Sequence, residues 1–324
     1  MHSIKDLQDF FSKELKNLKL NNEPNKLNAP IEYILEIGGK RVRPVLVLSA
    51  CEMFGGVLMD AFKPAMAIEV FHNFTLMHDD IMDEAPLRRG KKTVHTLYDI
   101  NTAILSGDVM LIYAYQLLED LEGELFKKIF RIFNKTAVKV CEGQRLDLNF
   151  ETMENVSIDE YIRMIEYKTA VLLGCSLEVG AYLGGADDSD AKNMYEFGRN
   201  LGIAFQIQDD ILDVFGDENN FGKKIGGDII QNKKTFLLLK SFELSGPEER
   251  KELDYWIAKN GADNEKKISS VTSIFEKLGV NKEAELSKKY YMEKALYHLD
   301  KVSSEATRKN ILIEISDMLL NRVN

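Results

Sequence analysis

The sequence contains little cysteine, and its cysteines do not form a metal or disulfide pattern. Only Cys51, Cys141 and Cys175 occur in 324 residues, and there is no Cys-x-x-Cys pair. An odd number of scattered cysteines is typical of free thiols in a reducing compartment, rather than of a disulfide framework or a zinc site. The first residues, Met1 to Phe11, are interrupted by charges and lack the apolar core of a signal peptide. These absences predict a cytoplasmic protein.

Long apolar runs and proline are also scarce, and negative charges outnumber positive ones. The formal net charge of -10 argues against nucleic acid or an anionic membrane surface as the main partner. No apolar run approaches the roughly 20 residues that span a bilayer, so we expect no transmembrane segment. Only six prolines occur, and the long proline-free stretches after Pro64 favour helices. With no alternating strand pattern, repeat or composition shift, the chain is predicted to be a single all-α domain over residues 1–324.

Three aspartates stand close together in Asp79-Asp80-Ile81-Met82-Asp83, within a helix expected over Ala65–Glu84. Residues four apart share one face of a helix, so Asp79 and Asp83 point the same way, with Asp80 on the flank. Carboxylates on a rigid support suit Mg²⁺, which usually shares its coordination sphere with a substrate phosphate. Taken alone, such a motif more often marks a solvated acidic face than a metal site.

A second cluster, Asp209-Asp210-Ile211-Leu212-Asp213, repeats the pattern, and Gln206 lies on the same helical stripe. Such a cluster is costly on one helix because like charges repel one another. Two of them are explained if their helices face each other across a cleft that holds Mg²⁺. The repeat therefore favours a metal site that binds a diphosphate over two solvated faces.

Basic residues accompany these clusters. Lys40, Arg41 and Arg43 follow the glycine pair Gly38-Gly39, and Arg88-Arg89-Gly90 follows the first acidic cluster. Arginine binds phosphate bidentately, although either run by itself could be ordinary surface charge. His72 lies two turns before Asp79, where a structural role is the simpler alternative. The polar, glycine-bearing segment from Gly216 to Gly227 is the best candidate for a mobile lid.

In this order the motifs resemble those of the trans-isoprenyl diphosphate synthases of the polyprenyl synthase family, which includes geranyl, farnesyl and geranylgeranyl diphosphate synthases. The matching residues are Gly38 to Pro44, the first DDxxD with Arg88-Arg89-Gly90, Gly143-Gln144, Lys168-Thr169, Phe205-Gln206 with the second DDxxD, and Gly222-Lys223 through Gly226, Asp228 and Lys233. One departure is Leu237, where many members have proline. The resemblance implies a helical bundle of the isoprenoid synthase type, with a central cleft between the two DDxxD helices.

The resemblance also implies a role for each matching residue. Two Mg²⁺ ions on the allylic diphosphate would be held by Asp79 and Asp83, with Asp80 beside them. A third would be held by Asp209 and Asp213, with Asp210 nearby, and Mn²⁺ is the expected substitute. The same diphosphate would be contacted by Arg88, Lys168, Lys223 and Lys233. Isopentenyl diphosphate would be bound by Lys40, Arg43, His72 and Arg89. Thr169 and Gln206 would lie near the allylic cation, and Phe205 would line the isopentenyl site. Because Lys223 and Lys224 are adjacent, the sequence leaves open which of them would contact the diphosphate, although the GKxxGxD spacing favours Lys223.

Product length depends on the residues just before the first acidic cluster. Phe74 and Phe71 lie five and eight residues before Asp79, and periodicity alone would make Phe74 a core residue. In the family, an aromatic residue five positions before the first DDxxD resembles short-chain synthases, and Thr75 in place of a second aromatic favours C20. We therefore expect a C15–C20 product, with geranylgeranyl diphosphate preferred over farnesyl diphosphate.

Two other functions are considered. A terpene cyclase shares the fold, but its second metal motif normally mixes Asn/Asp, Ser/Thr and Glu, and it lacks an isopentenyl site. A non-catalytic subunit of a heteromeric synthase tends to lose its acidic motifs, and both are intact here. The family resemblance further implies a homodimer.

Overall fold

The computed structural model describes residues 1–17, 24–216, 225–259 and 263–320, and it is helical along nearly all of them, which confirms the all-α prediction. The chain forms two compact units. The first unit comprises Met1–Asn134, Cys175–Met194 and Ser303–Leu312. The second unit comprises Lys135–Gly174, Tyr195–Val302 and Ile313–Asn324. Boundaries between the units fall inside α7 (Gly123–Thr152), α9 (Val171–Leu183), α10 (Asp188–Phe215) and α17 (Ala306–Leu320). Within the described ranges, no helix combines the length and apolarity that crossing a membrane requires.

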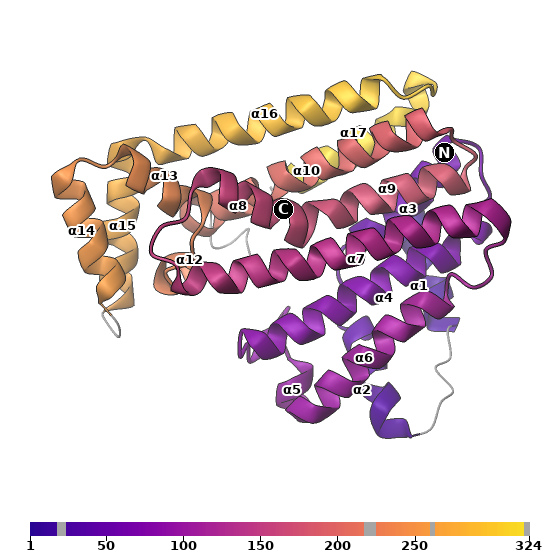
Figure 1. The fold of residues 1–324 in the computed structure, drawn as a ribbon, viewed down its shortest axis with the longest axis horizontal. Helices are drawn as coiled ribbons and strands as arrows, with labels where there is room; N and C mark the ends of the chain where they lie inside the picture. Colours follow the sequence, from indigo (N-terminus) through magenta and orange to yellow (C-terminus); the bar gives the residue numbers. More distant parts are fainter. Residues whose placement is uncertain (18–23, 217–224, 260–262, 321–324) are drawn as a thin grey trace. The chain divides into compact units, whose positions relative to one another are not determined.

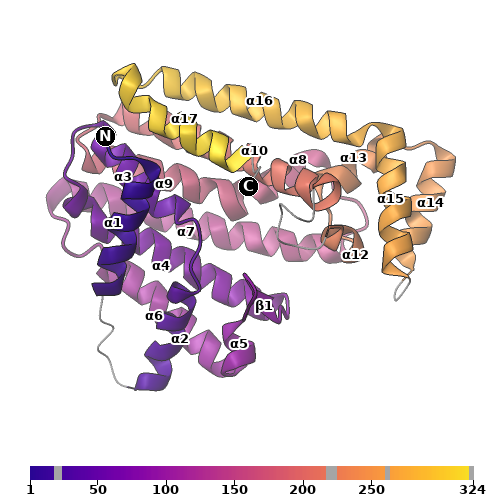
Figure 2. The same ribbon diagram turned by 180° about the vertical axis from the view of Figure 1, so that it is seen from behind.

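The first unit is organised around the long helix α4 (Leu58–Met82). This helix packs against α3 (Val42–Met53) and α6 (Ile100–Gln116), and α4 and α6 lie side by side in both views (Figures 1 and 2). The other described helices that lie wholly within the unit are α1 (Ile4–Asn17), α2 (Asn25–Glu36) and α5 (Val94–Leu97). Apolar residues of α4 are buried around most of its circumference, as expected for a central helix rather than a surface one. The first acidic cluster lies at the carboxyl end of α4.

The second unit has one continuous apolar core. It is formed mainly by α8 (Ile158–Ile165), α10, α13 (Phe236–Leu244), α15 (Asn264–Leu278) and α16 (Val280–Asp300). The shorter α12 (Gly227–Ile230) and α14 (Pro247–Ala258) pack against α15. The sequence Ser157-Ile158-Asp159-Glu160 predicts a capping box, and it is present at the start of α8. Ser157 Oγ accepts the Glu160 N–H at 3.2 Å, and the Ser157 N–H donates to Glu160 Oε2 at 2.8 Å.

Between α8 and α9 the helix contains a π-helical turn, Glu166–Ala170, in which the Val171 N–H bonds to the Glu166 carbonyl. A π-turn inserts one extra residue into a helix and is frequent at functional sites. The sequence predicts one uninterrupted helix through this segment, toward Gly174 or Leu183. The turn contains Lys168 and Thr169, so the one irregular turn of this helix coincides with two of the predicted site residues.

The sequence also predicts a connector over Asn21–Pro30, a loop over Pro86–Gly90 and two helices after a turn at Asn260–Asn264, and the structure differs at each of these places. The expected connector from Asn21 to Pro30 is helical from Asn25 onward, because the apolar residues after Pro30 are buried in the core. The segment after Pro86, expected to be a loop, forms a small hairpin of β1 (Leu87–Arg88) and β2 (Lys91–Lys92). Finally, Gly279 adopts a left-handed conformation (φ 69°) and ends α15, so three helices rather than two come after Asp263.

Candidate active site

The first aspartate cluster separates into two kinds of carboxylate. Asp80 is 2% exposed and is bound by Arg88, whose Nε lies 2.9 Å from both carboxylate oxygens and whose Nη2 lies 2.7 Å from Oδ1. Asp83 caps α4 and is exposed, while Asp79 is half-buried one turn earlier. The Asp80 charge is therefore balanced by Arg88, and Asp79 with Asp83 forms the more accessible part of the cluster.

This arrangement fits a divalent cation. The carboxyl end of a helix carries a partial negative charge, so three aspartates there are doubly unfavourable unless a cation is close. In the part of the chain that the structure describes, no three Asp, Glu, His or Cys side chains form a ready-made metal cage. Mg²⁺ does not need one, because it usually keeps several waters and takes one or two carboxylates together with substrate phosphates. Asp79 and Asp83 fit that kind of shared site.

Basic side chains predicted to bind isopentenyl diphosphate meet in the first unit. Arg89 lies at the tip of the hairpin with a left-handed φ of 52°, and Gly90 comes next at 75°. The Arg89 guanidinium rests against the backbone of Gly39, where an added Cβ would lie 2.4 Å from Nη1. Arg43 Nη1 lies 3.0 Å from Nε2 of His72 on α4. The glycine is thus needed to let Arg89 approach, which explains part of the predicted motif.

The charges of this basic cluster, defined as Arg43, His72 and Arg89, are only weakly compensated. The pKa of His72 lies well below its usual 6.5 because of burial and the nearby arginines, so its neutral Nε2 can accept a hydrogen bond from Arg43. Burial, together with Arg89, lowers the pKa of Arg43 to about 10, although Glu69 opposes the change. Among the described residues, no carboxylate forms an ion pair with Arg43 or Arg89. Cations that lower one another's pKa in this way would be stabilised by a bound anion.

The neighbouring members of the basic run behave differently from Arg43. Arg41 is 9% exposed, and its Nη1 lies 2.6 Å from Oε1 of Glu69 in a buried ion pair. Arg41 also donates to the carbonyl of Leu35, so it anchors α3 to the rest of the first unit. Lys40 is exposed, and its carbonyl accepts a hydrogen bond from Gln8 at 2.6 Å. Of the three basic residues, Arg41 is therefore structural, while Lys40 and Arg43 are the better candidates for binding an anion.

The second aspartate cluster lies near the carboxyl end of α10 in the second unit. Asp210 is 8% exposed, and its Oδ2 accepts the Tyr161 hydroxyl at 2.6 Å and the Phe236 N–H at 2.8 Å. Asp213 Oδ2 accepts the Asp228 N–H at 3.0 Å, which fixes the start of α12. Asp209 and Asp213 are half-buried. Again the middle aspartate is held by the protein, and the outer two are more exposed.

The environment of Asp210 disfavours its charge. Burial and the neighbouring Asp228 raise its pKa from the usual 3.8 to about 7, although the Tyr161 and Phe236 hydrogen bonds and Lys233 oppose the shift. Burial and Asp210 in turn raise the pKa of Tyr161 well above 10, so the phenol stays protonated and donates. A cation near this cluster would therefore lower the pKa of Asp210 and relieve the cost of ionising it.

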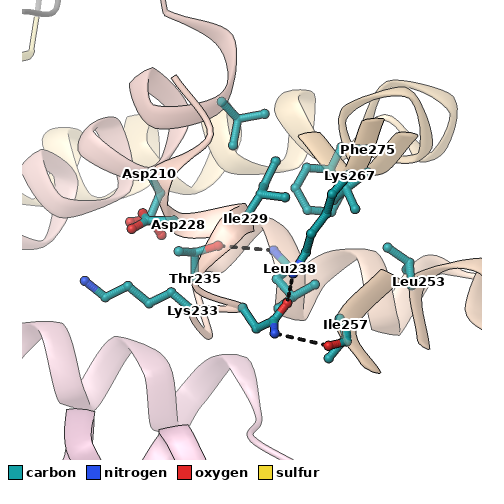
Figure 3. Close-up of a pocket in the computed structure, with 13 residues that line it drawn as sticks. Asp210, Asp228, Ile229, Lys233, Thr235, Leu238, Leu253, Ile257, Lys267 and Phe275 are labelled. Carbon is teal, nitrogen blue, oxygen red and sulfur yellow. Dashed lines mark hydrogen bonds between the residues drawn. The ribbon is translucent and has the colours of Figure 1, made fainter. Parts of the chain in front are cut away.

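Lys168 and Lys233 occupy different surroundings in the second unit. Lys168, in the π-turn, places its Nζ 2.5 Å from Oδ2 of Asp147 on α7. Lys233 is exposed, and its backbone N–H donates to the Asp228 carbonyl at 2.9 Å. Figure 3 shows Lys233 extending beside Asp210 and Asp228 at the edge of a cavity of about 20 Å³, which is room for a single water molecule.

The remaining predicted site residues are described only by their burial or lie outside the described residues. Thr169, Phe205 and Gln206 are half-buried in the second unit. Gly222, Lys223 and Lys224, and with them most of the predicted lid, lie outside the described residues. Two residues that bind predicted site residues, Tyr161 and Asp147, were not selected from the sequence. Neither belongs to a charged motif, and only the spacing of Tyr161 four residues after the Ser157 cap marks its position on α8.

The predicted chain-length residues on α4 fall into two environments. Phe71 is 1% exposed, and its ring packs on Phe133 with centroids 5.4 Å apart. Phe74 is 9% exposed and lies edge-on to His78 at 4.8 Å. Thr75 is half-buried, and its hydroxyl donates to the His72 carbonyl at 2.8 Å. Phe71 is thus a core residue of the first unit, and Phe74 is the better candidate for a boundary that a ligand could reach.

Comparison with known proteins agrees with these motifs. A sequence model of the polyprenyl synthetase family matches residues 24–275. A geranylgeranyl pyrophosphate synthase of Geoglobus acetivorans is 38% identical over 321 residues, which is 98% of each chain. A geranylgeranyl diphosphate synthase of Sulfolobus acidocaldarius is 39% identical over 291 residues, covering 89% of this chain and 88% of that relative. A crystal structure of geranylgeranyl pyrophosphate synthase matches the whole of both chains with a TM-score of 0.95 at 45% identity. The chain therefore belongs to the polyprenyl synthetase family and is a prenyltransferase.

Proposed function

We propose that the protein is a short-chain trans-prenyltransferase. It condenses isopentenyl diphosphate with an allylic diphosphate (dimethylallyl, geranyl or farnesyl) and releases pyrophosphate. The observation that carries this proposal is the basic cluster, whose two guanidinium groups and neutral imidazole gather beside α4 without a balancing ion pair among the described residues. A second anion site beside the aspartates is what distinguishes a condensing enzyme from a terpene cyclase.

Isopentenyl diphosphate is assigned to Lys40, Arg43, His72 and Arg89. Arg43 and Arg89 supply planar guanidinium groups that can bind phosphate oxygens bidentately. Neutral His72 orients Arg43 through the 3.0 Å contact instead of adding a third full charge. Phe205 is proposed to line the hydrocarbon part of this substrate.

The allylic diphosphate is assigned to the two aspartate clusters and their basic neighbours. Three Mg²⁺ ions, for which Mn²⁺ could substitute, would be held by the outer aspartates of the two clusters. These are Asp79 and Asp83, with Asp80 behind them, and Asp209 and Asp213, with Asp210 behind them. Bound Mg²⁺ neutralises the charge that develops on the departing diphosphate. Arg88, Lys168, Lys223 and Lys233 are proposed to contribute in the same way. The Asp80 and Asp210 contacts hold the clusters in place, because each middle aspartate is tied to the protein.

The chemical steps are ionisation, condensation and elimination. The allylic C–O bond breaks, and the double bond of isopentenyl diphosphate, held close and aligned, attacks the allylic cation. A proton then leaves the condensed product, and the released pyrophosphate is the proposed base. Thr169 and Gln206 are placed near the cation, and closure of the site must keep water from quenching it.

The proposed product is geranylgeranyl diphosphate, with farnesyl diphosphate as the shorter alternative. The named relatives support C20, and so does Thr75, which stands beside Phe74 in place of a second aromatic residue. Phe74 lies about 7.5 Å along the helix from Asp79, at about 1.5 Å per residue. An aromatic ring there would limit how far the growing chain extends along α4.

We also propose a cytoplasmic homodimer. Several apolar side chains of α6 are exposed on the first unit, among them Ile100 (54%), Leu105 (57%) and Ile112 (56%). A second copy of the chain would bury such a face, since apolar side chains gain about 25 cal/mol per Å² on leaving water. Light scattering coupled to size-exclusion chromatography tests this directly. A monomer at micromolar concentration would refute it.

The function is tested by incubating the pure protein with Mg²⁺, labelled isopentenyl diphosphate and each allylic primer in turn. A condensing enzyme yields a C20 alcohol after phosphatase treatment and releases one pyrophosphate per isopentenyl unit. A terpene cyclase would consume the allylic diphosphate without isopentenyl diphosphate and give hydrocarbon. A non-catalytic subunit would give neither product, and either of these results would overturn the proposal.

A further inference from the structure

The π-turn Glu166–Ala170 is held by unusually close backbone contacts on two sides. A Cβ on Gly143 of α7 would lie 2.1 Å from the backbone nitrogen of Lys168. A Cβ on Gly202 of α10 would lie 2.6 Å from Cα of Ala170. Real Cβ atoms do not approach other atoms this closely, so both positions require glycine. One glycine supports the middle of the turn and the other supports its end.

A charged contact supports the start of the same turn. Arg199 of α10 places Nη1 3.1 Å from Oε2 of Glu166, the first residue of the turn. The same guanidinium binds Glu196 on its own helix, with Nη2 at 2.7 Å and Nε at 2.9 Å from Oε2. Arg199 and Glu166 are both about one quarter exposed, with side-chain exposures of 23% and 22%. The ion pair is therefore partly shielded from solvent, and the turn is supported at its start as well.

A π-turn needs such support because its hydrogen bonds are poorer than those of an α-helix. The inserted residue also rotates the rest of the helix by about 100° relative to a regular one. In this chain the turn presents Lys168 and Thr169, and Lys168 Nζ already lies 2.5 Å from Asp147. If the turn relaxed to a regular helix, both side chains would point in new directions.

We propose that Glu166 and Arg199, together with Gly143 and Gly202, are positioning residues that fix the π-turn and thereby set where Lys168 and Thr169 meet the substrate. This inference rests on the proposed function, since it assumes that Lys168 and Thr169 act on the allylic substrate. None of the four residues needs to touch the substrate itself. Their effect should appear in turnover and not in binding of the isopentenyl diphosphate group, because the residues assigned to that group, Lys40, Arg43, His72 and Arg89, all lie in the first unit.

The test compares two carboxylates that bind the same guanidinium. Glu166→Gln removes the charge that holds the turn, and Glu196→Gln is the matched control, because it removes only the contact within α10. We expect Glu166→Gln to lower kcat about 10- to 100-fold, as a displacement of about 1 Å can cost a hundredfold. The KM for isopentenyl diphosphate should stay within about twofold of wild type, and Glu196→Gln should keep kcat within about twofold.

Four further variants separate positioning from simple loss of stability. Arg199→Met should match Glu166→Gln, and the double variant should be no worse than either single one, because both remove the same contact. Arg199→Lys should restore part of kcat. Gly202→Ala adds a Cβ against Ala170 at the other end of the turn and should also lower kcat. Far-ultraviolet circular dichroism and thermal melting establish that each variant is folded.

The outcomes distinguish this inference from the function on which it rests. A wild-type protein without condensation activity would overturn both. An active wild type with kcat unchanged in Glu166→Gln, or lowered equally in Glu196→Gln, would overturn the positioning role alone. A kcat for Arg199→Lys that is no higher than that for Arg199→Met would also overturn the positioning role, since the contact requires a cation.

Discussion

Replacing Asp210 with asparagine should stabilise the metal-free protein at alkaline pH. The carboxyl group is 8% exposed and accepts hydrogen bonds from Tyr161 and from the Phe236 N–H. Asparagine has nearly the same shape, and its amide oxygen in the place of Oδ2 can accept hydrogen bonds from both the Tyr161 hydroxyl and the Phe236 N–H. The substitution therefore removes a charge that the site disfavours while it leaves the packing of α10 intact.

The size of the effect can be worked from the pKa of Asp210, which burial and Asp228 raise from 3.8 to about 7. Because the folded value lies above the unfolded one, the folded state holds an extra proton between about pH 4 and pH 7, and stability falls as the pH rises through this window. At 1.36 kcal/mol per pH unit, full ionisation costs about 4 kcal/mol. Between pH 5 and pH 8 the wild type should lose about 2–3 kcal/mol that Asp210→Asn keeps.

Urea unfolding at pH 5 and pH 8 in EDTA, at one protein concentration, measures this difference. Asp254→Asn is the control, since Asp254 is an exposed carboxylate whose side chain is 55% accessible. The stability difference between wild type and Asp210→Asn should grow with pH, while that of Asp254→Asn should stay nearly constant. If the Asp210→Asn difference is the same at both pH values, the carboxyl does not titrate in this range, and the account of the second aspartate cluster is wrong. Condensation activity should fall in the same variant.

Three further predictions concern the first unit. Phe74→Ala should lengthen the products, and an unchanged product ladder on chromatography would refute its role as a boundary. Phe71→Ala should chiefly lower the free energy of unfolding, by about 3–5 kcal/mol, because the Phe71 ring is fully buried. Glu69→Ala leaves Arg41 buried without its partner and should cost about 3–5 kcal/mol in urea unfolding, and a loss below about 1 kcal/mol would contradict this. Because the pKa of His72 lies well below 6.5, the KM for isopentenyl diphosphate in wild type and in His72→Gln should run parallel from pH 6 to pH 8, and divergence would show that the imidazole titrates.

Much of the fold is predictable because local signals agree with it. Gly38-Gly39 separates two helices, the Ser157 capping box begins α8, and Pro247 lies in the first turn of α14, all as the sequence indicates. The failures occur where tertiary packing outweighs a local signal. Pro30 is accommodated inside α2 because the apolar residues after it are buried. The π-turn has no local signal, since it depends on glycines from two other helices.

The acidic clusters show a different limit of sequence reasoning. The DDxxD pattern predicts which residues gather on a helix face, but it does not predict that the middle aspartate is the buried one or what holds it. In the first unit that partner is Arg88, from the hairpin after α4, whereas in the second unit it is Tyr161, a residue outside every charged motif. Two clusters with the same spacing are therefore stabilised differently, by an ion pair in one and by a neutral hydrogen-bond donor in the other. Burial and the neighbouring Asp228 raise the pKa of Asp210, and a neutral donor opposes this shift less than a directly bound cation would.

The basic run after Gly39 shows why site residues cannot be assigned from charge alone. Lys40, Arg41 and Arg43 are equivalent as a sequence of cations, but Arg41 adopts a left-handed backbone with φ of 49° and is buried against Glu69. That pairing uses its charge inside the protein, so it can add little to anion binding. Arg43 meets a neutral imidazole instead and keeps its charge available. The distinction depends on two residues of α4, Glu69 and His72, about one helical turn apart. A helix that carries a carboxylate at one position and a neutral acceptor at the next turn thus decides which arginine is structural and which can bind diphosphate.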